Sequence, residues 1–322
     1  MIGHGKGSYR IVLSLVLLVL ISACGRISDG VQTPDEGKVR IVVTTTFIAD
    51  VVNNIAGDFV VTKSLLTVGQ NPHSYQPSPM DMVAITEADI ILANGFGLEE
   101  FLDDLLAGTD SKAEVIVVSE GISPLMMDRH QDEDEETHDG EDPMDAVMGL
   151  DPHVWFDPNN LLVWIENISR ALIEKDPENA DVYQANAEDY QEKLIELDGW
   201  IREKVAGIPA DQREIVTDHT TLGYFADEYG LIQIGAVIPA LTTEAETSGM
   251  ELAELIDTIR EYEVRAIFIG VDFNPDMAMR VAEETGVELV PLYFGSLSDG
   301  SPAGTYLSFM RYNVSAIVEA LQ

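Results

Sequence analysis

The chain has 322 residues, of which 46% are hydrophobic, so it carries enough apolar side chains for the cores of about two domains. Its 57 acidic and 18 basic residues give a net charge of −39. A polyanion of this size repels phosphate backbones, which argues against nucleic-acid binding. The single cysteine, Cys24, excludes an intrachain disulfide framework and a cysteine-ligated zinc finger.

Residues 1–23 have the features of a lipoprotein signal peptide. Lys6 and Arg10 precede an apolar run, residues 11–21, whose length suits a signal segment, whereas a membrane-spanning helix needs about 20 residues. The run ends in the letters ISAC, which resemble a bacterial lipobox, the motif in which cleavage precedes the cysteine and the thiol is lipidated. We expect Cys24 to anchor the mature protein to the outer face of the cell membrane, an extracytoplasmic location. A buried free cysteine is the alternative.

The next part of the mature chain predicts a tether followed by an α/β lobe. Residues 24–37 are polar and contain Gly and Pro, which is typical of a tether. Residues 38–176 alternate short apolar runs with helical stretches, which indicates a parallel sheet flanked by helices. The expected strands cover 39–44, 59–66, 90–93 and 115–118, and the expected helices cover 48–55, 79–87, 98–106 and 158–176.

An acidic stretch, residues 128–142, interrupts this lobe. It contains nine acidic residues, one arginine and two histidines, His130 and His138, and it has no apolar side chain. Such a segment cannot contribute to a core, so we predict a mobile loop.

A long helix and a second α/β lobe complete the predicted fold. Residues 177–207 have apolar side chains at helical spacing and predict a rigid linking helix of about 45 Å, long enough to join two lobes. Residues 208–322 then repeat the α/β pattern. The expected strands cover 214–217, 232–237, 266–270 and 287–292, and the expected helices cover 222–229, 250–262, 276–285 and 306–321. Two such lobes form a cleft, where ligands usually bind.

Three histidines lie in Pro-bounded loops or at the end of an expected strand. They are His73 in NPHSYQPSPMD, His153 in DPHVWFDP and His219 in DHTTLGYFADEYGL. In open α/β sheets these positions lie at the ligand-binding edge. A single loop histidine is more often a surface or hydrogen-bonding residue, but neutral imidazole is the commonest protein metal ligand. The three together therefore predict a metal site.

Taken together, the three patterns resemble the metal-binding lipoproteins that supply zinc or manganese ABC importers, the cluster A-I solute-binding proteins. The resemblance extends from about residue 38 to the C-terminus and includes the closing segment TYLSFMRYNVSAIVEAL. It implies two α/β lobes bridged by a long helix, with the metal in the interlobe cleft. Carried over by position, it implies that His73 and His153 of the first lobe and His219 of the second are the metal ligands. It also implies an ABC permease and its ATPase as partners.

The resemblance also bears on the identity of the metal. Similar proteins with a carboxylate at the third position are typically manganese binders, and a histidine there goes with zinc, so His219 indicates Zn²⁺, with Mn²⁺ as the alternative. Three imidazoles suit Zn²⁺, whereas carboxylate-rich sites suit the harder Mn²⁺. The family often places a fourth, acidic ligand in the loop after the last strand, where this chain has Gly295. Asp299, Asp272 or a water molecule remain alternatives for the fourth position.

We therefore expect a monomeric binding protein, not an enzyme, that captures Zn²⁺ and delivers it to the permease. A metallochaperone or adhesin on the same scaffold is an alternative that the sequence does not separate from import. A zinc hydrolase is the least favoured alternative. Asp218 or Asp157 would have to serve as its base, and the chain contains no HExxH helix and no GxSxG elbow.

Overall fold

The computed structural model describes residues 1, 35, 37–126, 149–240, 243, 245–300 and 302–322. The predicted lipidation site Cys24, nearly all of the predicted signal peptide and tether, and the acidic stretch 128–142 lie outside these residues. Residues 1–38 and 39–322 form separate compact units, and the fold described below is that of the second unit. In the described part of the chain, no helix has both the length and the apolar character that crossing a membrane requires.

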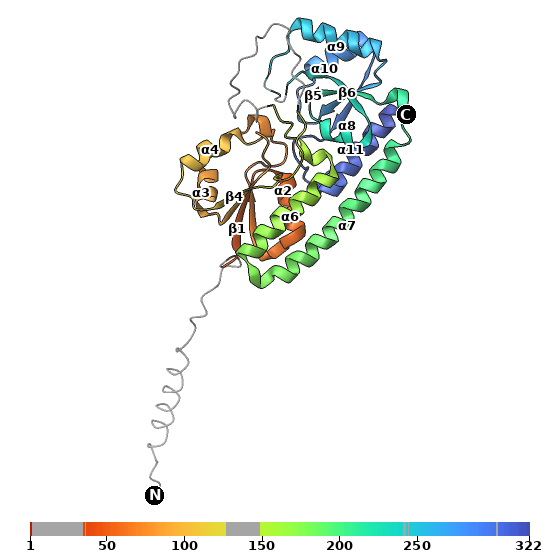
Figure 1. Ribbon diagram of the computed structural model, residues 1–322. Helices are drawn as coiled ribbons and strands as arrows, with labels where there is room; N and C mark the ends of the chain where they lie inside the picture. The colour runs from red at the N-terminus through yellow and green to blue at the C-terminus, as the bar shows by residue number, and fades with distance from the viewer. Residues whose placement is uncertain (2–34, 36, 127–148, 241–242, 244, 301) are drawn as a thin grey trace, which may run out of the picture. The chain divides into compact units, whose positions relative to one another are not determined.

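The first lobe is built on a four-stranded parallel sheet in the order β2-β1-β3-β4, with helices on both faces (Figure 1). Its elements are β1 (Val39–Val43), α2 (Thr46–Ala56), β2 (Val60–Ser64), α3 (Pro79–Glu87), β3 (Ile90–Ala93), α4 (Glu100–Ala107), β4 (Glu114–Val117) and α6 (Pro158–Lys175). Alternate side chains of β1 enter different cores, because successive residues of a strand point to opposite faces. Ile41 and Val43 pack with α2 and α6, whereas Val42 packs with α3 and α4.

Local capping interactions determine where two of these helices begin. Asp157 caps α6, because its carboxylate accepts a hydrogen bond of 2.8 Å from the backbone N–H of Asn159, and Pro158 occupies the first helical position, as the sequence predicts. Helix α4 begins two residues later than expected. The half-buried Glu99 carboxylate accepts hydrogen bonds from the backbone N–H groups of Asn94 (2.7 Å) and Gly95 (2.9 Å), which holds the preceding residues in a loop.

The second lobe repeats this architecture with a parallel sheet in the order β6-β5-β7-β8. Its elements are β5 (Glu214–His219), α8 (Gly223–Tyr229), β6 (Ile232–Ile238), α9 (Gly249–Glu261), β7 (Ala266–Gly270), α10 (Asp276–Thr285), β8 (Glu288–Leu292) and α11 (Tyr306–Leu321). Val216 and Ile267 pack with α9 and α10 on one face, whereas Ile215 and Phe268 belong to the core that contains α8 and α11 on the other. Strand β5 extends two residues beyond its predicted end, so that His219 lies on the strand itself.

A single helix, α7 (Ala180–Val205), joins the two lobes. Its 26 residues span about 39 Å and lie along one side of the molecule in Figure 1. The helix packs against α2 and α6 of the first lobe and against α8 and α11 of the second. Pro177 opens a short 3-10 turn, Pro177–Asn179, rather than the helix itself. The predicted long joining helix between two α/β lobes is confirmed.

The two lobes also share one continuous apolar core. Phe47 of α2 stacks on Trp155 with ring centroids 4.9 Å apart and meets Phe309 of α11 at 5.0 Å. The Tyr306 hydroxyl of α11 donates a hydrogen bond of 2.8 Å to the Trp155 carbonyl. Because these contacts cross from one lobe to the other next to α7, separating the lobes widely would expose buried aromatic surface.

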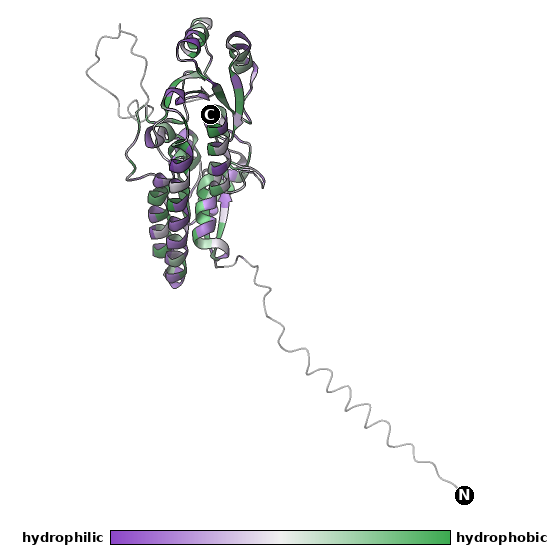
Figure 2. Ribbon diagram, turned by 90° about the vertical axis from the view of Figure 1, so that its right-hand side faces the viewer, coloured by the Kyte–Doolittle hydropathy of each residue, from purple (hydrophilic) through white to green (hydrophobic). Residues whose placement is uncertain are grey.

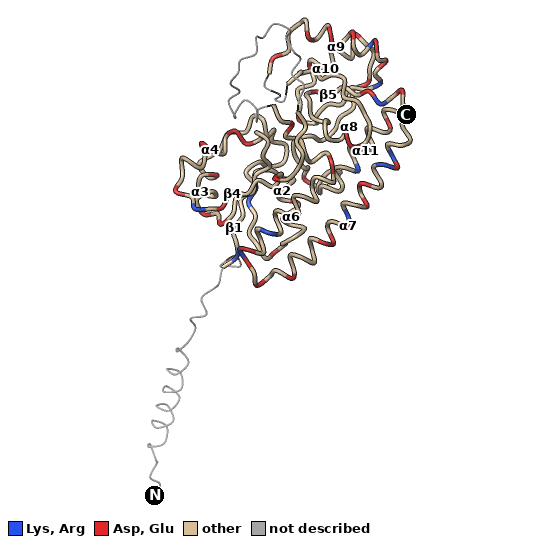
Figure 3. Tube along the Cα trace, viewed as in Figure 1, with Lys and Arg blue, Asp and Glu red and all other residues tan. Residues whose placement is uncertain are grey.

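The surface is polar and strongly acidic. Figure 2 shows hydrophilic and hydrophobic residues alternating along the helices, as expected for helices that cover a sheet with one face and meet water with the other. Figure 3 shows acidic residues spread over both lobes, with fewer basic residues among them. This distribution agrees with the net charge of −39 and leaves no large basic surface for a polyanion in the described residues.

Candidate metal centre

The second lobe contributes His219, the last residue of β5, whose side chain is buried at 5% exposure. The preceding residue, Asp218, holds the ring in place, because its Oδ1 lies 2.6 Å from His219 Nδ1. The other oxygen, Oδ2, accepts a hydrogen bond of 2.6 Å from the backbone N–H of Gly270 at the end of β7. A carboxylate on Nδ1 keeps the proton on that nitrogen and leaves the lone pair of Nε2 available for a metal.

The first lobe contributes His153, which is 1% exposed and comes just before the 3-10 turn Val154–Phe156 that leads into α6. Asp151 holds this histidine twice. Its Oδ1 accepts a hydrogen bond of 2.9 Å from the His153 backbone N–H and lies 2.7 Å from His153 Nδ1. The arrangement repeats that of His219, so Nε2 of His153 also carries the free lone pair.

His73, the second histidine of the first lobe, is held by its backbone rather than by a carboxylate. It lies in the 3-10 turn Pro72–Ser74, which follows β2. Asn71 caps this turn, because its Oδ1 accepts a hydrogen bond of 2.9 Å from the His73 N–H. The Asn71 amide also donates to the Thr243 hydroxyl of the second lobe, which ties the turn across the cleft.

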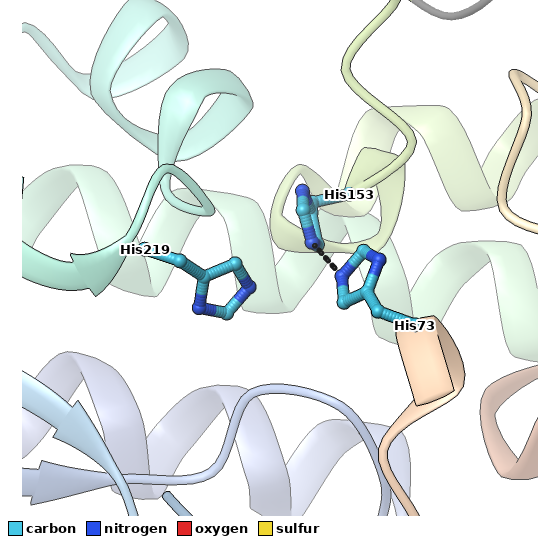
Figure 4. A group of neighbouring side chains, drawn as sticks. All are labelled: His73, His153 and His219. Atoms are coloured by element: carbon cyan, nitrogen blue, oxygen red, sulfur yellow. Dashed lines mark hydrogen bonds between the residues drawn. The ribbon is translucent and has the colours of Figure 1, made fainter. Parts of the chain in front are cut away.

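The three imidazoles converge on one point between the lobes, as Figure 4 shows. Their ring centroids lie 5.2, 5.4 and 5.3 Å apart, which makes a nearly equilateral triangle. One nitrogen of each ring lies within 4.8 Å of the other two. His73 Nε2 and His153 Nε2 are 3.1 Å apart, close to the roughly 3.3 Å that separates two nitrogens bound to one tetrahedral zinc ion. The arrangement therefore suits the binding of a single ion.

Burial keeps two of these histidines in the neutral form that metal binding requires. Burial lowers the pKa of His73 well below its usual value of 6.5, and the neighbouring imidazoles of His153 and His219 lower it further. Burial also lowers the pKa of His153, although the carboxylate of Asp151 partly opposes this effect. At neutral pH both rings are therefore uncharged, and no proton competes with a metal ion for their lone pairs.

A cavity of about 170 Å³ lies in front of the three histidines and opens to solvent. Its lining residues come from both lobes and mix apolar with polar side chains: Asn71, Pro72, His73, His153, Asp218, His219, Thr221, Thr243, Gly270, Asp272, Phe273, Asn274, Phe294 and Gly295. A cavity of this kind gives an ion a path to the site and leaves space beside it for a fourth ligand.

The cavity separates the alternatives for a fourth ligand. Both Asp272 and Asp299 are exposed, but only Asp272 belongs to the lining of the cavity. Gly295 also lines the cavity, but a Cβ at this position would lie 2.8 Å from Pro72 Cδ of the opposite lobe. A side chain at position 295 would therefore push against the turn that carries His73 unless the turn shifted.

Reasoning from the sequence missed the two carboxylates that orient the histidines. The sequence alone indicates no function for Asp151 and makes Asp218 only a possible base of a hydrolase, whereas the structure bonds Asp218 to His219 and Gly270. A signal for both was present, since an aspartate stands one or two residues before each of two candidate ligands.

Comparison with known proteins places the chain in a family. The ZnuA family, described as zinc-uptake complex component A, periplasmic, matches residues 41–320. The chain is 32% identical over 309 residues to the manganese-binding lipoprotein MntA of Halalkalibacterium halodurans, covering 95% of this chain and 96% of that protein. It is 34% identical over 284 residues to the iron-binding protein YfeA of Yersinia pestis, covering 88% and 86% of the two chains.

A solved structure supports the same assignment. The periplasmic zinc-binding protein TroA from Treponema pallidum matches with a TM-score of 0.76 at 28% identity, covering 88% of this chain and 99% of that one. The three relatives are named for manganese, iron and zinc, so the likeness is to metal-binding proteins in general and not to the binders of one metal. Proteins of this family are transport components, so the zinc-hydrolase alternative is wrong. The chain belongs to the ZnuA family of metal-binding proteins, the extracytoplasmic substrate-binding components of metal ABC importers.

Proposed function

We propose that this protein captures Zn²⁺ between its lobes with the Nε2 atoms of His73, His153 and His219 and delivers the ion to the membrane permease of an ABC importer. The observation that carries the proposal is the near-equilateral triangle of imidazoles, two of which, His153 and His219, are buried and hydrogen-bonded to carboxylates. Three imidazole nitrogens with one open position suit Zn²⁺, which is stable with four ligands and accepts nitrogen readily.

Mn²⁺ is the second candidate ion. The relative MntA is named as manganese-binding, and a carboxylate, Asp272, lines the cavity in front of the histidines. Carboxylate oxygens suit Mn²⁺ better than imidazole alone does.

Calorimetric titration of the metal-free protein tests the capture step. We expect one Zn²⁺ per chain with micromolar or tighter affinity, and the loss of most of this affinity in the His219→Ala variant. The proposal would be contradicted if wild type did not bind Zn²⁺ or bound several ions per chain. It would also be contradicted if His219→Ala bound Zn²⁺ as tightly as wild type does.

The delivery step needs a separate test, because a metallochaperone or an adhesin would use the same site. We expect cells that lack only this protein to take up less zinc when the metal is scarce, and uptake to recover when the wild-type chain is restored. Restoring a chain with Cys24→Ala is expected to release the protein from the membrane and to give only partial recovery, because we propose that Cys24 carries the lipid anchor. Uptake that is unaffected by the deletion would contradict a role in import.

A further inference from the structure

The three histidines leave the charge of a bound ion uncompensated within its own ligand set. All three rings are neutral donors, and the carboxylates behind them, Asp151 and Asp218, are already bonded to histidine nitrogens. Asp218 is fully engaged, since its second oxygen accepts the Gly270 N–H. A divalent cation in such a site gains affinity from one further anionic oxygen at its open position.

Asp272 is the remaining carboxylate of the cavity lining. It lies in the turn that follows β7, in which the Phe273 N–H donates a hydrogen bond of 3.0 Å to the Gly270 carbonyl. Strand β7 pairs directly with β5, the strand that ends in His219. Because neighbouring parallel strands lie about 4.8 Å apart, Asp272 leaves the same edge of the sheet as His219 and from the adjacent strand.

The glycine at position 270 brings the Asp272 carboxylate close to the histidine support. A Cβ added at Gly270 would lie 3.1 Å from Asp218 Oδ2 and 3.4 Å from Asp272 Oδ1, so both oxygens lie within 3.4 Å of one point. The absence of a side chain at Gly270 thus leaves room for the Asp272 carboxylate beside the group that orients His219.

The Asp272 side chain is also able to move. No other described side chain or backbone N–H outside its own residue forms a hydrogen bond with its carboxylate. Within the described residues, the group of ligand atoms within 4.8 Å of one another contains only the three histidines, so binding of the ion by Asp272 requires rotation about its two side-chain bonds.

We propose that Asp272 supplies the fourth ligand, a carboxylate oxygen that closes on the bound ion and makes the site accept Mn²⁺ as well as Zn²⁺. This inference rests on the proposed three-histidine site and adds one ligand to it. A hard oxygen donor contributes more to the affinity for Mn²⁺ than to that for Zn²⁺, which three imidazoles already hold well. Asp272 is therefore a residue that determines metal specificity.

The test compares Asp272→Asn with Asp299→Asn, which makes the same change of charge at an exposed position outside the cavity. Zn²⁺ and Mn²⁺ affinities are measured by calorimetry with a competing chelator, and Co²⁺ is used as a probe whose visible absorption changes with its ligands. We expect Asp272→Asn to weaken Mn²⁺ binding by roughly tenfold or more, to weaken Zn²⁺ binding by a smaller factor, and to change the Co²⁺ spectrum. Asp299→Asn is expected to give wild-type values in all three measurements. Both variants are expected to keep the melting temperature of the metal-free protein close to that of wild type.

Two results would overturn the assignment of Asp272 while leaving the proposed function intact. In the first, Asp272→Asn binds both metals as Asp299→Asn does. In the second, Mn²⁺ affinity falls but the Co²⁺ spectrum does not change, so Asp272 acts only as a nearby charge. Failure of the proposed function would look different, because wild type would then bind neither ion, or His219→Ala would bind both as wild type does.

Discussion

The sheet of the first lobe runs β2-β1-β3-β4 and that of the second runs β6-β5-β7-β8, the same order of corresponding strands, yet the lobes hold their histidines in different ways. The second lobe presents His219 from the end of β5, with Asp218 bonded both to the ring and to β7. The first lobe presents His73 from a three-residue turn beyond β2, and no carboxylate of the described residues bonds its ring. A ligand on a strand takes its rigidity from the sheet, whereas a ligand on a loop depends on caps such as Asn71 and on contacts with the other lobe.

The largest expected effect separates these two kinds of ligand. Replacing His219 by alanine is expected to reduce Zn²⁺ affinity by roughly 100-fold or more, because it removes the only imidazole of the second lobe and leaves Asp218 without its partner. His73→Ala is expected to cause a smaller loss, because no carboxylate increases the basicity of that ring. Calorimetric titration of both purified variants measures the difference. An equal or larger loss in His73→Ala would contradict the distinction between the lobes.

Substitution of the two orienting carboxylates is expected to have the next largest effect. An asparagine side chain offers a single acceptor oxygen, so Asp218→Asn keeps the bond from Gly270 or the bond from His219, but not both. We expect a loss of roughly 10-fold to 100-fold in Zn²⁺ affinity and of about 1–3 kcal/mol in the free energy of unfolding of the metal-free protein.

Asp151→Asn provides the matched comparison in the first lobe, because both bonds of Asp151 Oδ1 go to His153. It is expected to weaken Zn²⁺ binding and to affect the stability of the metal-free protein less than Asp218→Asn does. Urea unfolding of the two metal-free variants decides the point, and a larger loss of stability in Asp151→Asn would show that β5 is not the better supported ligand position.

The pH dependence of stability provides a smaller effect that belongs to the first lobe. Burial lowers the pKa of His73 well below 6.5, so below about pH 6.5 the unfolded chain takes up a proton at this residue that the folded metal-free protein does not. The free energy of unfolding therefore loses this contribution as pH falls. Burial raises the pKa of Asp157 to about 6, so the folded protein takes up a proton there more readily than the unfolded chain, and this contribution to stability grows as pH falls. The effect of His73 is therefore isolated by comparing the slope of the unfolding free energy against pH in wild type with the slope in His73→Gln.

We expect the free energy of unfolding, measured over roughly pH 7.5 to 5, the range around the pKa of free imidazole, to fall less steeply with decreasing pH in His73→Gln than in wild type. Equal slopes in the two proteins would contradict the burial of a neutral His73 in the metal-free state.

The smallest expected effect concerns the movement of one lobe against the other. Helix α7 packs against both lobes, and Phe47 of α2 contacts Phe309 of α11, so wide hinge bending would break a shared core. We expect small-angle scattering profiles of the metal-free and metal-bound proteins to be nearly superimposable. A marked decrease in the radius of gyration on metal binding would show that the lobes separate in spite of this core.

The order and type of the elements could be predicted because each carries a local signal. The helix Pro79–Glu87 and the strand Ile90–Ala93 have the bounds that proline placement and apolar runs indicate. The start of α4 could not be predicted, since it depends on the Glu99 carboxylate binding two backbone N–H groups of the preceding loop. The same applies to the end of β5, since its last residue, His219, belongs to the strand because it pairs with Ile238 of β6.

The candidate site, too, could be predicted from the sequence only in part. The histidine motifs, read together with the family resemblance, predict which residues come together, and the structure brings all three within reach of one ion. The surroundings of the three histidines depend on contacts between residues that are distant in the sequence, and a single sequence does not indicate such contacts. The approach of Pro72 to Gly295 and the placement of Asp272 in the cavity lining are of this kind.

Diffraction from crystals grown with Zn²⁺, recorded on both sides of the zinc absorption edge, shows directly whether the three histidines bind one ion. We expect one anomalous peak between the lobes, at about 2.0–2.1 Å from the Nε2 atoms of His73, His153 and His219. A peak elsewhere in the molecule, or one that contacts fewer than three of these rings, would contradict this expectation.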